Sequence, residues 1–155
     1  MAALAEEEIE IGIVAFLEPK ILQQDRRVCH TQDPPVTRFG PFLCIAVEGE
    51  SSSWSPVTTT PNPARLELSE KWRKGGQPQW LKEDQYLNDG ANLWKGPNES
   101  FVAASFKERT DPTDRARLSP EGLRVVEQEL EAQKGRRDRD CGTYGSSTLS
   151  GSIGS

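Results

Sequence analysis

Long apolar runs and an export signal are both missing from the sequence. No stretch approaches the roughly 20 apolar residues that a membrane-spanning helix needs. Residues 1–10 carry four glutamates, where a secretory signal would need a basic start and an apolar centre. We therefore expect a cytoplasmic protein with no membrane partner.

Metal-binding and nucleophile motifs are missing as well. The chain has one histidine, His30, and its three cysteines are far apart, with neither a C-x-x-C pair nor a finger-like array with histidine. The phosphate-binding loop, the serine-hydrolase elbow and the H-E-x-x-H zinc motif are absent. The sequence therefore predicts no metal site, no cofactor and no disulfide framework.

Positive charge is in short supply, since the formal net charge is -5. Nucleic-acid binding needs Lys and Arg to neutralise phosphates, so this balance weakens the case for such a partner. Most of the excess is local, because it comes from the glutamates of residues 1–10. The rest of the chain is close to neutral, and a local basic face for RNA is compatible with it.

What the sequence does contain favours strands. Residues 9–17 are rich in β-branched side chains, and residues 42–49 form an apolar run typical of a strand buried on both faces. A glycine-serine turn and a second strand at 54–60 complete a predicted antiparallel hairpin. Pro56 lacks a ladder donor, which indicates an edge or a bulge and suits an exposed site. Residues 18–37 are polar and proline-containing, which predicts a long loop.

Later segments predict short strands and one helix. The strands are expected at 65–68, 85–87 and 100–106. Ser119 is a typical N-cap with a proline and a glutamate after it, Leu123, Val126 and Leu130 form one apolar stripe, and Gly135 ends the helix. The expected organisation is a disordered acidic segment at 1–8, one domain at 9–134, and a disordered Arg/Gly/Ser-rich tail at 135–155.

Three tryptophans, Trp72, Trp80 and Trp94, lie among turn signals in the Trp-rich segment 66–94. They either pack into the core or line a surface that binds a partner. The solvent exposure of the three tryptophan side chains distinguishes these alternatives. One solvent-facing patch would favour an interaction module, and burial would remove the patch.

Hydroxyl groups cluster on the predicted strand at 54–60, after a loop that carries arginines. The hydroxyls belong to Ser55 and Thr58, Thr59 and Thr60, and the arginines are Arg26, Arg27 and Arg38. Cleavage of RNA by its own 2′-hydroxyl needs proton transfer and a cation or donor for the developing phosphorane charge. An arginine and a hydroxyl supply these without metal. The alternative is that edge-strand threonines are ordinary β formers and loop arginines are solvated.

Five segments in this order resemble the MazF/PemK family of toxin endoribonucleases. They are IGIVAF at 11–16, PFLCIAV at 41–47, SPVTT at 55–59, SFVAASFKERT at 100–110 and RLSPEGLRVVEQEL at 117–130. They are similar to the family's first strand, its proline-started strand, its Pro-x-Thr-like segment, its late strand and its terminal helix. The resemblance implies a mostly β fold, an antiparallel SH3-like β-barrel with one C-terminal amphipathic α-helix.

The resemblance also implies catalytic roles for Thr58 and Arg38. The family's arginine stands immediately before the strand's proline, where this sequence has Gly40, so Arg38 would act from two residues earlier. The expected substrate-binding residues are Ser55, Thr59, Arg26 and Arg27.

The implied function is that of a metal-independent endoribonuclease, the toxin of a toxin–antitoxin-type system. Its expected partners are single-stranded RNA, an antitoxin protein and a second copy in a homodimer. Two alternatives stay open: a non-catalytic SH3-like barrel that binds a protein, and a phage-type structural protein whose tails order on neighbouring subunits.

Overall fold

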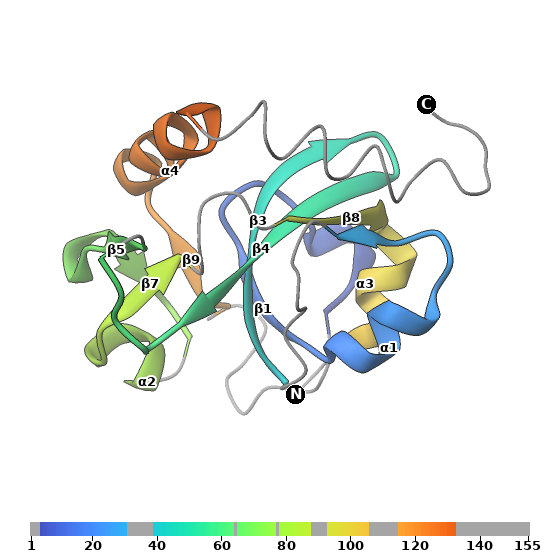
Figure 1. Ribbon diagram of the computed structural model, residues 1–155, viewed down its shortest axis with the longest axis horizontal. Helices are drawn as coiled ribbons and strands as arrows, with labels where there is room; N and C mark the ends of the chain where they lie inside the picture. Colours follow the sequence, from blue (N-terminus) through green and yellow to red (C-terminus); the bar gives the residue numbers. More distant parts are fainter. Residues whose placement is uncertain are drawn as a thin grey trace.

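A computed structural model describes residues 4–30, 39–63, 65–76, 78–87, 93–105 and 115–132 (Figure 1). The helices are α1 (Pro19–Gln24), α2 (Pro78–Lys82), α3 (Asn98–Ala104) and α4 (Pro120–Ala132), with 3-10 turns η1 (Glu6–Glu8) and η2 (Glu70–Trp72). The strands are β1 (Val14–Leu17), β2 (Cys29–His30), β3 (Gly40–Glu48), β4 (Ser51–Thr58), β5 (Leu66–Leu68), β6 (Arg73–Lys74), β7 (Gln85–Leu87), β8 (Trp94–Pro97) and β9 (Arg117–Leu118).

The long hairpin of β3 and β4 runs through the centre of the molecule (Figure 1). Its two strands pair antiparallel, with one irregularity in register beside Ala46. Gly49 begins the two-residue turn with a φ of 62°, a conformation that glycine reaches without the steric cost of a Cβ. β1 pairs with the other edge of β3. The predicted hairpin is confirmed, and so is the first strand, although β1 starts only at Val14.

β4 changes its second partner halfway along its length. Residues 51–54 pair with β8, whereas Val57 and Thr58 pair with β7. Pro56 lies in the gap between these two ladders, where a residue without an amide donor is best tolerated. The side chain of Pro56 is buried. The interruption of strand pairing expected at Pro56 is therefore present on one edge of β4, but Pro56 itself is not exposed to solvent.

The remaining strands extend the sheet on both sides of β4. β5 pairs with β7 and β2 pairs with β8, while β6 and β9 form a separate ladder. The main path is β1-β3-β4-β7-β5, and its two end strands do not pair with each other within the described ranges. The prediction of a mostly β, antiparallel fold is confirmed, and the sheet is open.

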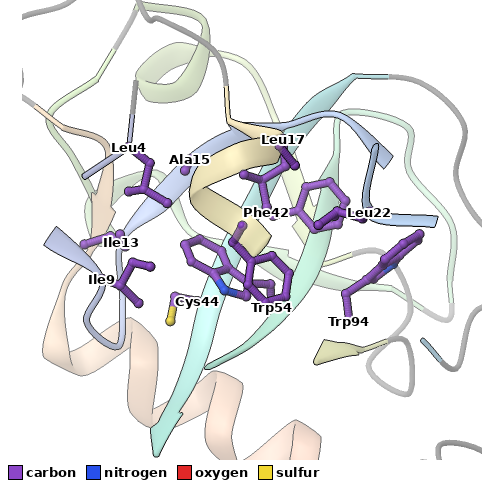
Figure 2. Packing of buried hydrophobic residues seen from close by; sticks show 12 residues of the cluster. Leu4, Ile9, Ile13, Ala15, Leu17, Leu22, Phe42, Cys44, Trp54 and Trp94 are labelled. Atoms are coloured by element: carbon purple, nitrogen blue, oxygen red, sulfur yellow. The ribbon is translucent and has the colours of Figure 1, made fainter. Parts of the chain in front are cut away.

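Apolar cores cover both faces of the central hairpin, because neighbouring strand residues point to opposite faces. Phe42 and Trp54 belong to a first core that includes residues of α1 and α3, and Figure 2 shows both side chains within this cluster. Leu43 and Val57 belong to a second core, which includes residues of β5, β7 and α4. α1 and α3 therefore lie on one side of the hairpin and α4 lies on the other (Figure 1).

The predicted helix is confirmed in α4. The Ser119 hydroxyl accepts a 3.3 Å hydrogen bond from the Gly122 amide, as an N-cap does. Val126 and Leu130 are buried in the second core, and Leu123 packs against it. The expected end of the helix at Gly135 and the tail 135–155 lie outside the described residues.

Two expectations about irregular segments are wrong. Residues 98–104 form α3 rather than a strand, because Pro97 starts the helix and Phe101 and Ala104, three residues apart, bury one helical face. The long loop expected at 18–37 contains α1 and β2 in its described part. The Glu18 side chain caps α1 by accepting from the Lys20 amide, and a proline occupies the first helical position.

The acidic segment near the N-terminus packs against the rest of the chain where the structure describes it. Leu4 is 2% exposed and belongs to the first core. Glu8 lies in η1, and its carboxylate is 2.8 Å from the guanidinium of Arg115, whose side chain is 3% exposed. Residues 4–8 therefore contact the rest of the chain, because Leu4 buries apolar surface and Glu8 pairs with a buried charge. The disorder expected for residues 1–8 stays a prediction.

The described helices are too short or too polar to cross a membrane. Among the cysteines, Cys44 is a buried free thiol, and its burial raises its pKa to about 12.

Candidate functional site

The three tryptophans do not form one solvent-facing patch. Trp80 is 3% exposed and Trp94 is fully buried, and Trp72 is half-buried against the second core. Burial in the core is therefore the correct alternative for Trp80 and Trp94. The surface that would have favoured a protein-binding module is not formed by these residues.

Arg27 belongs to a cluster that joins α1 to α3. Its guanidinium lies 3.1 Å from Asp25 Oδ2 and 2.7 Å from Glu99 Oε2. Asp25 Oδ2 also accepts a 2.6 Å hydrogen bond from Ser100 Oγ. Arg27 therefore has a structural role in linking two helices.

The sheet register keeps this cluster away from Thr58. Across β2, β8 and β4, the paired positions align Cys29 with Ser53. Thr58 is five residues further along β4, a distance of about 16 Å at the usual rise of a strand. Arg26 and Arg27 precede β2 on the opposite side, so the structure does not bring these two predicted substrate-binding residues to Thr58.

The predicted residues of β4 divide between interior and surface. Ser55 is fully buried, so its hydroxyl does not reach solvent in this conformation. Thr58 is half-exposed and Thr59 is exposed. Arg38 lies outside the described residues. Phe42 is paired with Pro56 in the β3–β4 ladder. Two residues further along, the same register places Gly40 opposite Thr58, so the start of β3 lies beside the end of β4.

Thr58 begins a row of polar side chains across three strands. Thr58 in β4 is paired with Tyr86 in β7, and Tyr86 is paired with Glu67 in β5. Directly opposed residues of antiparallel strands share a face, with Cβ atoms about 4.5–5.5 Å apart. A hydroxyl, a phenol and a carboxylate therefore lie side by side. We call these three residues the Thr58 row.

The face of the sheet on which this row lies follows from the neighbouring row. Val57, Leu87 and Leu66 are paired in the same way and pack in or against the second core. Because adjacent residues alternate between faces, the Thr58 row points away from that core. Its members are half-exposed or exposed. α4 packs with the second core, so it covers the opposite face and leaves the row open.

A tight turn at the end of β4 brings an arginine to Thr58. The Thr60 amide donates a 3.1 Å hydrogen bond to Thr58 Oγ1, so the Thr58 hydroxyl accepts this bond and keeps its own proton for donation. The Thr60 carbonyl accepts a 2.7 Å hydrogen bond from Arg65 Nη1. A single residue thus links the Thr58 hydroxyl to a guanidinium.

The electrostatics of the row favour a protonated phenol. Burial and the negative charges of Asp84 and Glu67 raise the pKa of Tyr86. Tyr86 therefore remains a proton donor at neutral pH, while Glu67 beside it is an acceptor when ionised. Arg65 adds the positive charge that an anionic ligand needs at the end of β4.

Three residues of this site were not found from the sequence, namely Arg65, Glu67 and Tyr86. The only sequence signal for them was the pair of short strands predicted at 65–68 and 85–87. The alternation in each places Glu67 and Tyr86 opposite to their leucine neighbours, but the partner strand and its register are not local properties.

The described residues around Thr58 hold no metal-binding cluster, and the chain has no recognised relative that assigns a role to them. In the part of the chain that the structure describes, no cluster of His, Cys, Asp and Glu side chains could hold a metal ion. Comparisons with protein-family models, curated proteins and solved structures find no match to this chain.

Proposed function

We propose that the protein is a metal-independent endoribonuclease that cleaves single-stranded RNA at the Thr58 row. The observation that carries the proposal is the grouping of a hydroxyl, a phenol and a carboxylate on one open face, beside an arginine. These groups match the needs of RNA transesterification, in which a proton leaves the 2′-hydroxyl and negative charge develops on the phosphorus oxygens.

Within this proposal, Thr58 and Arg65 hold the scissile phosphate. Thr58 Oγ1 accepts from the Thr60 amide and keeps its own proton, which it donates to a non-bridging oxygen of the phosphate. Arg65 supplies the charge, since guanidinium groups bind phosphate by paired hydrogen bonds. Arg65 thereby compensates for Gly40 at the position where the MazF/PemK family has its arginine. Arg38, two residues before Gly40, remains the second candidate for the same role.

The wider assignment follows the same reasoning. We propose that the chain is a divergent member of the MazF/PemK-like toxins. We also propose that its antiparallel sheet, which is open in the described residues, corresponds to the SH3-like barrel of that family. Single-stranded RNA is the substrate, and an antitoxin protein and a homodimer are the partners. The observed order of the long hairpin and the final helix α4 supports this assignment, whereas α3 in place of the late strand departs from it.

RNA cleavage by the purified chain tests this proposal. The protein is incubated with mixed-sequence single-stranded RNA in excess chelator, and the products are resolved on a gel. Thr58→Ala should reduce cleavage at least about 10²-fold, as expected for loss of a group that stabilises developing charge. Ser51→Ala removes a hydroxyl at the opposite end of β4 and should leave the rate unchanged. Intact RNA, or equal rates for both variants, would reject the proposed function.

A further inference from the structure

Glu67 and Tyr86 stand on the same face as Thr58 but are not needed to hold the phosphate. β5 alternates between core and surface, with Leu68 buried in the second core and Glu67 exposed on the other side. β7 alternates in the same way around Tyr86, with Leu87 buried. Two adjacent groups that differ in acidity, one an acceptor and one a donor, are the components of general acid–base catalysis.

We propose that Glu67 is the general base and Tyr86 the general acid of the RNA cleavage, an assignment that rests on the function proposed above. Glu67 takes the proton from the 2′-hydroxyl as O2′ forms its bond to phosphorus. The bond from phosphorus to O5′ breaks, and Tyr86 gives its proton to O5′. The products are a 2′,3′-cyclic phosphate and a 5′-hydroxyl. Water then returns the proton from Glu67 to the Tyr86 phenolate, so the cycle closes without an oxidant or a metal.

The order of Thr58, Tyr86 and Glu67 across the sheet is compatible with a general base at Glu67 and a general acid at Tyr86. Tyr86 is the middle member and neighbours both Thr58 and Glu67. A phosphate that lies over the middle of the row is therefore about one strand spacing from Thr58 on one side and from Glu67 on the other, with the Tyr86 phenol beside it, so its O2′ can face Glu67 and its O5′ can face Tyr86. Since neighbouring strands are about 4.8 Å apart, the whole row covers about 10 Å.

Burial and nearby negative charges raise the pKa of Tyr86 and favour the protonated phenol that a general acid requires. Tyr86 faces Glu67 on β5 and Asp84 at the start of β7, and both negative charges oppose formation of a phenolate. Glu67 also interacts electrostatically with Arg73 of β6. α4 packs on the other face of β5 through its apolar side chains.

Kinetics with a chimeric oligonucleotide that contains a single ribonucleotide separate the two roles. The wild-type rate should be low in acid, rise with pH as the general base loses its proton, and then stay level to pH 9. Glu67→Gln should lower the rate about 10²–10⁴-fold and remove the acidic limb. Glu67→Asp should retain that limb at a reduced rate. Glu48→Gln, an exposed carboxylate at the other end of β3, is the matched control and should behave as wild type.

A substrate with sulfur in place of O5′ tests Tyr86, because a thiolate leaves without a proton. Tyr86→Phe should be slowed about 10²-fold or more on the oxygen substrate and restored to near the wild-type rate on the sulfur substrate. Glu67→Gln should stay slow on both. A merely structural Tyr86 would slow both substrates equally, and that result would overturn the assignment.

The outcomes distinguish this assignment from the proposed function. If wild-type protein cleaves neither substrate, the endoribonuclease proposal fails and the acid–base assignment fails with it. If wild-type protein is active while Glu67→Gln and Tyr86→Phe keep its rate and pH profile, only the acid–base assignment fails. Thermal unfolding of each variant identifies loss of fold, and the Glu67→Asp profile then decides the role of the carboxylate.

Discussion

Substitution of Asp25 measures how much the polar interactions between the end of α1 and α3 contribute to the free energy of unfolding. Its carboxylate accepts hydrogen bonds from the Arg27 side chain and from Ser100 Oγ. These interactions, chiefly the bonds from Arg27, lower the pKa of Asp25 from 3.8 to about 2. The folded state therefore stabilises the ionised carboxylate.

The size and sign of the effect follow from this shift. One pKa unit corresponds to about 1.4 kcal/mol, so the full shift would be worth somewhat over 2 kcal/mol. Arg27 is more than half exposed, so solvent screening reduces the contribution to about 1–2 kcal/mol. Because the folded pKa is depressed, this stability is present above about pH 4 and is lost as the pH falls toward 2.

Urea denaturation of wild type and Asp25→Asn at several pH values measures the contribution. At pH 7 the substitution should lower the free energy of unfolding by about 1–2 kcal/mol, and the difference should shrink steadily between pH 4 and pH 2. Asp84→Asn is the matched control, because its carboxylate is exposed, and it should change stability by less than about 0.5 kcal/mol. A difference for Asp25→Asn that is independent of pH would refute the reasoning.

Two further predictions concern α4 and are read by thermal or chemical unfolding. Val126→Ala should cost about 2 kcal/mol, because the side chain is 1% exposed in the second core, whereas Val125→Ala, half-buried in the same helix, should stay within about 0.5 kcal/mol. Equal losses would contradict the packing of α4. Gly122→Ala gains about 1 kcal/mol of helix propensity but places its Cβ 2.8 Å from Trp72 Cγ. The cost of overpacking should exceed the gain in helix propensity, so the free energy of unfolding should fall by about 1 kcal/mol and the tryptophan fluorescence should shift. A stabilised variant would refute this.

Elements with local signals were predicted well from the sequence. The hairpin of β3 and β4 depends on two apolar strands and a Gly49 turn, and α4 depends on the Ser119 cap and a stripe at helical spacing. α3 was mistaken for a strand because its apolar run is short and carries its helical period for less than two turns. Such a run has no periodicity that separates helix from strand.

The candidate site was only partly predictable from the sequence, because the pairing of distant strands is not a local property. Thr58 was found because a hydroxyl-rich strand end is visible in the sequence. Tyr86 and Glu67 join it through pairings across three strands, and such register depends on the whole sheet. Ser55 was misplaced because the strand is buried on both faces at that point, so alternation alone does not tell which hydroxyl reaches solvent.

The chemical identity of the RNA ends shows whether cleavage occurs without metal at the Thr58 row. Wild-type protein and Thr58→Ala are incubated in chelator with a single-stranded RNA, and the product ends are identified by mass spectrometry. We expect 2′,3′-cyclic phosphate and 5′-hydroxyl ends from wild type, with the variant at least about 10²-fold slower. Products with 5′-phosphate ends, cleavage only when a divalent metal is added, or full activity of Thr58→Ala would contradict a metal-independent site at the Thr58 row.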